Sequence, residues 1–130
     1  MSAGRRSPVR ARPRLTSAPA ESDGCVRAAV SLPVDEDEWV FAGHYPDFPI
    51  FPGVCVVDCA VSGALMTAPR PDLALSGIDS ARFSGAVYPG DRLDIDLAWR
   101  PNGPEWTCTA TAATGRGKAA SVRLRFGVAA

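Results

Sequence analysis

The chain has 130 residues, 46% of them hydrophobic, and its 14 basic and 14 acidic side chains give a formal net charge of zero. This length corresponds to one domain, and the apolar content can form a single core without a disulfide or a metal ion. The absence of any run of about 18 apolar residues argues against a membrane-spanning helix. No apolar signal-peptide core follows Met1, so we do not expect secretion. Zero net charge argues against a protein that binds nucleic acid through bulk electrostatics.

Charge is nevertheless distributed unevenly along the chain. Residues 1–22 carry five Arg and a single acid, Glu21, and they are rich in Ser, Pro and Ala. Such a segment cannot offset its ordering entropy by burial, so we expect a disordered Arg/Pro-rich tail over 1–22 and a folded domain over 23–130. A start codon assigned too early would give the same pattern. A transit peptide is the alternative, although three prolines would interrupt the amphipathic helix that it needs.

The four cysteines are not spaced for a metal site. Cys25, Cys55, Cys59 and Cys108 form no Cys-x-x-Cys pair, and no His lies near them at ligand spacing. We therefore expect no zinc, and interpret these cysteines as small buried hydrophobes in a reducing cytoplasm.

The first half of the folded domain predicts one strand and one helix. Residues 25–32 have strand character, and an acidic turn and a short apolar segment follow. Residues 42–53 hold three Pro and two Gly and are expected to be an irregular loop. Residues 54–66 are apolar on every side except Asp58 and Ser62, which predicts a helix buried all round.

The second half predicts about four antiparallel strands. The segments 73–83, 91–100, 105–114 and 119–128 are strand candidates, and the last three alternate apolar with polar residues. Asn102-Gly103 is a hairpin turn signal between two of them. A single apolar helix has to be surrounded, so we predict an α+β fold in which a curved antiparallel sheet wraps around it. Pairing with a second copy would remove an exposed sheet edge.

Two polar residues stand out against this apolar background. His44 is the only His and lies in the Pro-rich loop, and Asp58 is the only charge between Gly53 and Pro69. An Asp isolated in a core should have a raised pKa and suits a general acid, whereas His suits a general base. The Gly53 N–H, at the positive end of the helix dipole, can stabilise an oxyanion. The structural alternatives are an ordinary His and an Asp that caps the backbone or pairs with an Arg such as Arg82.

The whole string around these residues resembles a known family. Residues 41–58, FAGHYPDFPIFPGVCVVD, are similar to the signature of the β-hydroxyacyl-acyl carrier protein dehydratases (the FabZ/FabA family). Its pattern His-x-Pro-x-x-Pro-x-x-Pro-Gly begins at His44 and ends at Gly53, and the family's carboxylate falls on Asp58. A second block, GIDSARFSGAVYPGDRL over 77–93, also resembles the family. The resemblance spans about residues 25–128.

The resemblance implies a hotdog fold, in which a long helix is wrapped by a curved antiparallel sheet. It also implies a dimer whose active sites combine the His of one subunit with the acid of the other. The substrate would be a thioester on the phosphopantetheine arm of acyl carrier protein, and no metal or redox cofactor would be needed. Phe51, Val54, Ser62 and Phe83 would bind this substrate.

The activity implied is the dehydration of (R)-3-hydroxyacyl thioesters to trans-2-enoyl thioesters in fatty acid or polyketide biosynthesis. His44 would remove the α-proton, the Gly53 N–H would stabilise the carbonyl oxygen, and Asp58 of the partner chain would protonate the departing hydroxyl. Because acyl carrier proteins are acidic, basic residues near the tunnel should help docking. The candidates are Arg82, Arg123 and Arg125, whose alternative role is a solvated sheet face.

Three departures from the family pattern keep further functions open. FabZ-type members have Glu at the position of Asp58 and usually Gln at that of Ser62, and the segment over about 67–72 is short. These changes fit a specialised relative, for example in polyketide assembly, or one subunit of a heterodimeric dehydratase with little activity alone. A hotdog thioesterase or a plain acyl-binding module would also have this fold. Large side chains at Phe48, Phe51, Phe83 and Tyr88 predict a short acyl tunnel.

Overall fold

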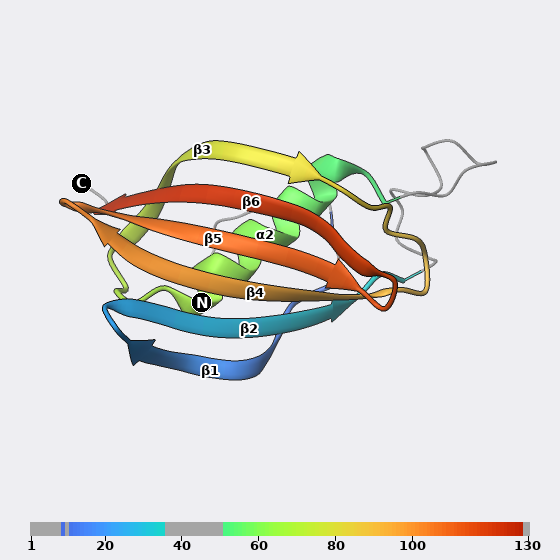
Figure 1. The fold of residues 1–130 in the computed structure, drawn as a ribbon, viewed down its shortest axis with the longest axis horizontal. Helices are drawn as coiled ribbons and strands as arrows, with labels where there is room; N and C mark the ends of the chain where they lie inside the picture. The colour runs from blue at the N-terminus through green and yellow to red at the C-terminus, as the bar shows by residue number, and fades with distance from the viewer. Residues whose placement is uncertain (1–8, 10, 36–50, 129–130) are drawn as a thin grey trace.

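The computed structural model describes residues 9, 11–35 and 51–128 of the chain. Its elements, in chain order, are β1 (Arg14–Ser22), β2 (Cys25–Pro33), α2 (Gly53–Thr67), β3 (Leu73–Phe83), β4 (Arg92–Asn102), β5 (Glu105–Thr114) and β6 (Gly117–Val128). The strands form one antiparallel sheet in the order β1-β2-β4-β5-β6-β3. Figure 1 shows the sheet bowed, with α2 behind it. The predicted α+β architecture of one helix against a curved antiparallel sheet is therefore confirmed.

The core lies between α2 and the inner face of the sheet. The alternation predicted for the last three strands is observed, since every second side chain of β4, β5 and β6 is buried. Most of the largest buried side chains come from these strands and from β2, and they include Trp99, Phe126 and Leu32. Trp99 and Phe126 pack at a ring-centroid distance of 4.8 Å. Helix α2 packs against this inner face of the sheet.

Residues 14–22 are a strand, where the sequence analysis expects a disordered tail. β1 pairs antiparallel with β2, with Arg14 opposite Ser31 and Ser22 opposite Cys25. All nine of its residues are exposed. Because main-chain hydrogen bonds to a neighbouring strand need no apolar side chains, a strand can form here without the burial that the prediction took as essential. Asp23-Gly24 forms the tight turn, and both residues have positive φ.

Helix α2 packs two rows of small side chains against the sheet. Cys55, Cys59 and Gly63 form one row, and the other is Val56, Ala60 and Ala64; all six residues are buried. At Gly63 an added Cβ would lie 3.0 Å from Val30 Cγ2 and 3.3 Å from Leu97 Cδ1. A methyl group at this position would therefore require the Val30 or Leu97 side chain to move by a few tenths of an ångström.

The C-terminal end of α2 is tied to the core by a buried hydrogen bond. Trp99 Nε1 donates to Thr67 Oγ1 at 3.1 Å, and Thr67 Oγ1 donates to the Gly63 carbonyl at 2.9 Å. The indole N–H would otherwise be unsatisfied in a fully buried ring. This bond fixes where the helix ends relative to β4.

The expectation that α2 is buried on every side is wrong. Val54, Leu65 and Met66 are 71%, 42% and 48% exposed. The sheet covers only one side of the helix. The exposed apolar side chains on the other side have the character of a surface that a partner covers.

Strand β3 is an edge strand whose inner face is apolar and exposed. Leu75, Ile78 and Phe83 are between 39% and 52% exposed. They lie opposite the buried Phe126, Leu124 and Ala120 of β6, so they belong to the inner face of the sheet. An edge with exposed apolar side chains is a template for pairing with another chain.

All four cysteines are buried and form no disulfide, in agreement with the interpretation as small hydrophobes. In the part of the chain that the structure describes, no helix has the length and apolar character needed to cross a membrane.

Candidate functional site

The start of α2 is anchored from two directions. Phe51 is 3% exposed, and its N–H donates to the Val87 carbonyl at 2.7 Å. Pro52 follows in an extended conformation, and its carbonyl accepts the N–H groups of Cys55 at 2.9 Å and Val56 at 3.2 Å. The helix therefore begins at Gly53, one residue before the predicted range 54–66, and buried Phe51 holds that beginning in place.

The first turn of α2 presents an uncapped positive end. No side chain caps the helix at Pro52, and the first turn holds no acidic residue. Among the described residues, no acceptor is found for the Gly53 N–H. The end of β3 lies beside it, since a Cβ at Gly53 would be 3.0 Å from Phe83 Cζ. A free backbone N–H at the positive end of a 15-residue helix can stabilise negative charge on an oxygen atom.

Asp58 lies on the side of α2 that the sheet does not cover. It is half-buried, where the sequence analysis expects a carboxylate isolated in the core. Val54 precedes it by four residues and Ser62 follows it by four, so the three side chains form one stripe along the helix. Asp58 is the only charged residue of α2. A single carboxylate therefore lies on the same side of the helix as the exposed apolar side chains.

Gly53 and Asp58 do not face the same space within one chain. Five residues along an α-helix correspond to a rotation of about 140°. The Gly53 N–H lies at the end of the helix beside Phe83, whereas Asp58 belongs to the stripe of Val54 and Ser62.

The other predicted site residues lie in three different places. His44 and Phe48 lie outside the described residues. Phe51, Val54 and Phe83 gather at the start of α2, with Phe51 buried and the other two exposed. Ser62 is half-buried two turns further along the helix, next to Asp58 rather than Gly53.

The three predicted docking arginines do not share one environment. Arg125 Nε is 3.2 Å from Asp79 Oδ1, so its charge is paired. Arg82 and Arg123 line a hollow on the outer face of the sheet together with Lys118 and four hydroxyl side chains. Lys118 is not among the residues predicted from the sequence. The alternation of residues 119–128 places Arg123 on the outer face of the sheet. It does not show that β3 pairs with this strand, and that pairing is what brings Arg82 close to Lys118 and Arg123.

Part of the second sequence block builds the fold rather than a site. Gly90 has φ 90°, a conformation that favours glycine, and its N–H donates to the Val34 carbonyl at 2.7 Å. The Asp91 carboxylate accepts the Tyr88 N–H at 2.8 Å and pairs with Arg116. Burial acts to raise the pKa of Asp91, but the bonds from Arg116 and Tyr88 outweigh it and hold the pKa below its ordinary value. This turn ties β4 to the end of β2.

Among residues 9, 11–35 and 51–128, no three His, Cys, Asp or Glu side chains come close enough to hold a metal ion. The expectation of a metal-free site remains a prediction, because His44 is not among these residues.

Comparison with known proteins identifies relatives for most of the chain. Residues 20–122 match the family model of ApeI-like proteins, described as ApeI dehydratase. A 3-hydroxyacyl-[acyl-carrier-protein] dehydratase FabZ of Pelotomaculum thermopropionicum is 36% identical over 110 residues, which cover 78% of this chain and 79% of that one. The FabZ of Symbiobacterium thermophilum is 43% identical over 70 residues, and this match spans about half of each chain, 49%.

A solved structure shows the same fold. The dehydratase heterocomplex ApeI:P from Xenorhabdus doucetiae superimposes with a TM-score of 0.69 at 21% identity, covering 89% of this chain and 98% of that one. Helix α2 packed against a curved antiparallel sheet is therefore the hotdog fold.

Proposed function

Because this chain belongs to the family of ApeI-like dehydratases, we propose that it removes water from (R)-3-hydroxyacyl thioesters on acyl carrier protein. The product is a trans-2-enoyl thioester. Relatives named as 3-hydroxyacyl-[acyl-carrier-protein] dehydratases support this substrate class. Fatty acid and polyketide assembly both supply such thioesters, and a cytoplasmic location stays a prediction.

The observation that carries the proposal is the uncapped start of α2. Removal of a proton next to a thioester carbonyl places negative charge on the carbonyl oxygen. The Gly53 N–H has no acceptor among the described residues and lies at the positive end of the helix. It is therefore suited to donate a hydrogen bond to that oxygen and stabilise its negative charge. Loss of one such donor typically costs about 10²–10³ in rate.

Proton transfer is assigned to His44 and Asp58. His44 takes the α-proton as the carbon–carbon double bond forms. The bond between the β-carbon and its hydroxyl breaks, and the Asp58 carboxyl gives its proton to that hydroxyl, which leaves as water. A second proton transfer from His44 to Asp58 through solvent restores both groups. No electron acceptor is involved, so the proposed reaction needs no redox cofactor.

We propose that Asp58 acts across a subunit boundary. Gly53 and Asp58 point to different sides of α2, and exposed apolar residues surround both the Asp58 stripe and the inner face of β3. A second hotdog chain that pairs at the β3 edge would cover these residues and bring its own Asp58 to this chain's Gly53. The ApeI:P structure is a heterocomplex, so a related chain is the alternative to a second copy.

Substrate contacts are assigned to the residues around the start of α2. Phe51, Val54 and Phe83 lie there, and Ser62 lies beside Asp58. The ring of Phe83 next to Gly53 limits the space for an acyl chain, which supports a preference for short chains. A chain-length series in which long acyl groups react fastest would contradict this assignment.

The deciding experiment follows one 3-hydroxyacyl-carrier thioester by intact mass with the purified protein alone. We expect the wild type to remove one water, and His44→Ala and Asp58→Asn to leave the substrate unchanged. Release of the free acid would show a thioesterase and overturn the proposal. If the wild type leaves the thioester unchanged, the assay is repeated with a co-purified related chain, and failure there also refutes it.

The subunit arrangement is tested by light scattering after gel filtration. Ile78→Asp places a charge on the exposed inner face of β3 and should convert a dimer to a monomer. Ala74→Asp is the matched control, since Ala74 is exposed on the same strand but opposite Gly127 on the outer face. A wild type that is monomeric at micromolar concentration, alone and with a related chain, would refute the shared site.

A further inference from the structure

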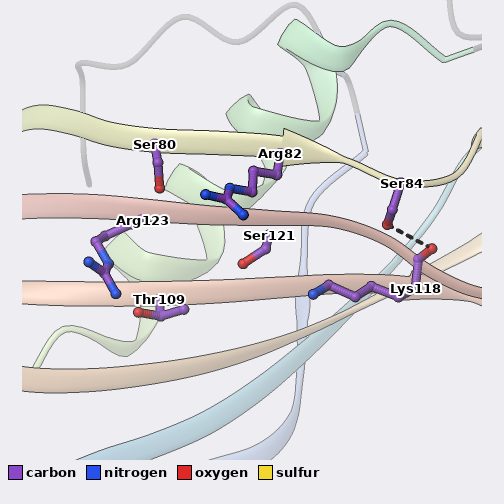
Figure 2. Close-up of a pocket in the computed structure, with 7 residues that line it drawn as sticks. All are labelled: Ser80, Arg82, Ser84, Thr109, Lys118, Ser121 and Arg123. Carbon is purple, nitrogen blue, oxygen red and sulfur yellow. Dashed lines mark hydrogen bonds between the residues drawn. The ribbon is translucent and has the colours of Figure 1, made fainter.

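The outer face of the sheet has a hollow lined by positive and hydroxyl side chains. It measures about 410 Å³ and lies on the face turned away from α2 (Figure 2). Its lining consists of three cations, Arg82, Lys118 and Arg123, and four hydroxyl residues, Ser80, Ser84, Thr109 and Ser121. None of the described acidic side chains lines it.

The strand register builds this cluster from three strands. Arg123 of β6 stands between Thr109 of β5 and Ser80 of β3. Arg82 of β3 stands opposite Ser121 of β6, two residues before Arg123. Diagonal neighbours of this kind are about 7–8 Å apart, within reach of two long side chains for one small ligand. Figure 2 shows both arginines on the same side of the ribbons.

Backbone contacts hold the end of the hollow in place. The Ser84 N–H donates to the Ala119 carbonyl at 2.8 Å, and Ser84 Oγ donates to the Lys118 carbonyl at 3.3 Å. At Gly85 a Cβ would lie 2.9 Å from the Lys118 carbonyl oxygen, so only glycine allows this approach. These contacts fix the backbone of Lys118 relative to the end of β3.

The charges in the hollow are not balanced within the described chain. None of Arg82, Lys118 and Arg123 forms an ion pair with a described carboxylate. The neighbouring hollows differ, because one contains Arg27 with Asp96 and the other contains Arg116 paired with Asp91. Three cations held together without a counter-charge repel one another, and an anion in the hollow would relieve that repulsion.

We propose that this hollow is a binding site for a phosphate group. Guanidinium groups bind phosphate oxygens with paired hydrogen bonds, Lys adds a point charge, and hydroxyl groups donate to the remaining oxygens. A concave site with four hydroxyl groups suits a small oxyanion better than a flat protein surface. The phosphate can belong to a free coenzyme A-type molecule or to the phosphopantetheine arm of a carrier protein.

The direct test is isothermal titration of the full chain with pyrophosphate at constant ionic strength. We expect saturable binding with one ligand per chain. Arg123→Gln should weaken this binding about tenfold, because it removes a charge-assisted hydrogen bond. Arg27→Gln is the matched control: it makes the same change in net charge on the same face, and it should alter the affinity by less than about twofold.

Two results would overturn the proposal. One is the absence of saturable pyrophosphate binding to the wild type, and the other is an equal loss of affinity in Arg27→Gln and Arg123→Gln. Neither result depends on dehydratase activity, so the proposed function can stand or fail separately.

Competition identifies the source of the phosphate. Displacement of pyrophosphate by coenzyme A supports a free ligand. Displacement by a carrier protein that bears phosphopantetheine, but not by the same carrier without it, supports the carrier-borne phosphate. This part of the test rests on the proposed function. Equal displacement by both forms of the carrier would show that the hollow recognises an acidic protein surface, which contradicts the phosphate site.

Discussion

The ring of Phe83 lies against the backbone of Gly53, so that a Cβ at Gly53 would be 3.0 Å from Phe83 Cζ. This contact joins the end of β3 to the start of α2. It places an edge-strand aromatic ring beside the N–H group to which we assign charge stabilisation.

Gly53→Ala should therefore disturb the site more than the fold. The new methyl group meets the exposed and movable Phe83 ring, which has to shift toward the substrate. A ring displaced into the space that a substrate would occupy should lower kcat/KM about tenfold, which corresponds to about 1.4 kcal/mol in activation free energy. Unfolding should change little, because Ala favours a helix over Gly. Steady-state dehydration kinetics and thermal unfolding measure the two effects.

The control for this prediction is the double variant Gly53→Ala/Phe83→Leu. If the ring causes the loss, Gly53→Ala should cost much less in the Phe83→Leu background than in the wild type. Additive losses would show that the methyl group acts through something other than Phe83.

Gly63→Ala should destabilise the whole domain. Its Cβ would lie 3.0 Å from Val30 Cγ2, between α2 and the core strands β2 and β4. We expect a loss of about 1–3 kcal/mol in the free energy of unfolding, measured by urea denaturation. Val30→Ala should reduce that loss by making space. Gly115→Ala is the matched control and should be neutral, since a Cβ there meets nothing within 4 Å; a loss equal to that of Gly63→Ala would contradict this account.

Burial of Cys108 predicts a loss of stability at alkaline pH. Burial, with a smaller contribution from Cys25, raises the pKa of the Cys108 thiol from 9.0 to about 12. Below pH 9 the thiol is protonated in both states, and this contribution to stability is fully present. Above pH 9 the unfolded chain ionises first, so stability falls until the pH reaches about 12.

Urea denaturation under reducing conditions can measure this effect. Between pH 9 and about 10.5 the wild type should lose about 2 kcal/mol more than Cys108→Ala, whose background titrations are the same. Identical slopes in the two proteins would show that the Cys108 thiol ionises equally readily in the folded and unfolded states.

The sequence predicts the buried half of the fold better than its edges. Alternation in β4, β5 and β6 is visible because each strand has one dry face, and Pro52-Gly53 marks the start of α2. β1 carries no such pattern, because it is held by main-chain pairing to β2 and all of its side chains are exposed. The exposure of Val54 and Met66 was not predictable either, since an apolar helix has the same composition whether the sheet or another chain covers it.

In the candidate site, too, some features could be predicted from the sequence and others depend on how the strands pair. Asp58 and Gly53 could be selected from the sequence because a lone charge and a Pro-Gly pair are unusual in an apolar run. The contact of Phe83 with Gly53, and the gathering of Arg82, Lys118 and Arg123, depend on β3 pairing with β6. Strand order is not encoded locally: β3 precedes β4 in the chain but lies beside β6.

The central claim is that water is eliminated at a site that two chains share, and mixing two inactive variants tests it most directly. His44→Ala and Asp58→Asn should each be inactive alone. After subunit exchange in equal amounts, half of the dimers are mixed and each has one intact site of two, so about a quarter of wild-type activity should return. If mixed dimers form, the wild type is active and no activity returns, His44 and Asp58 act within one chain, and the shared site is refuted.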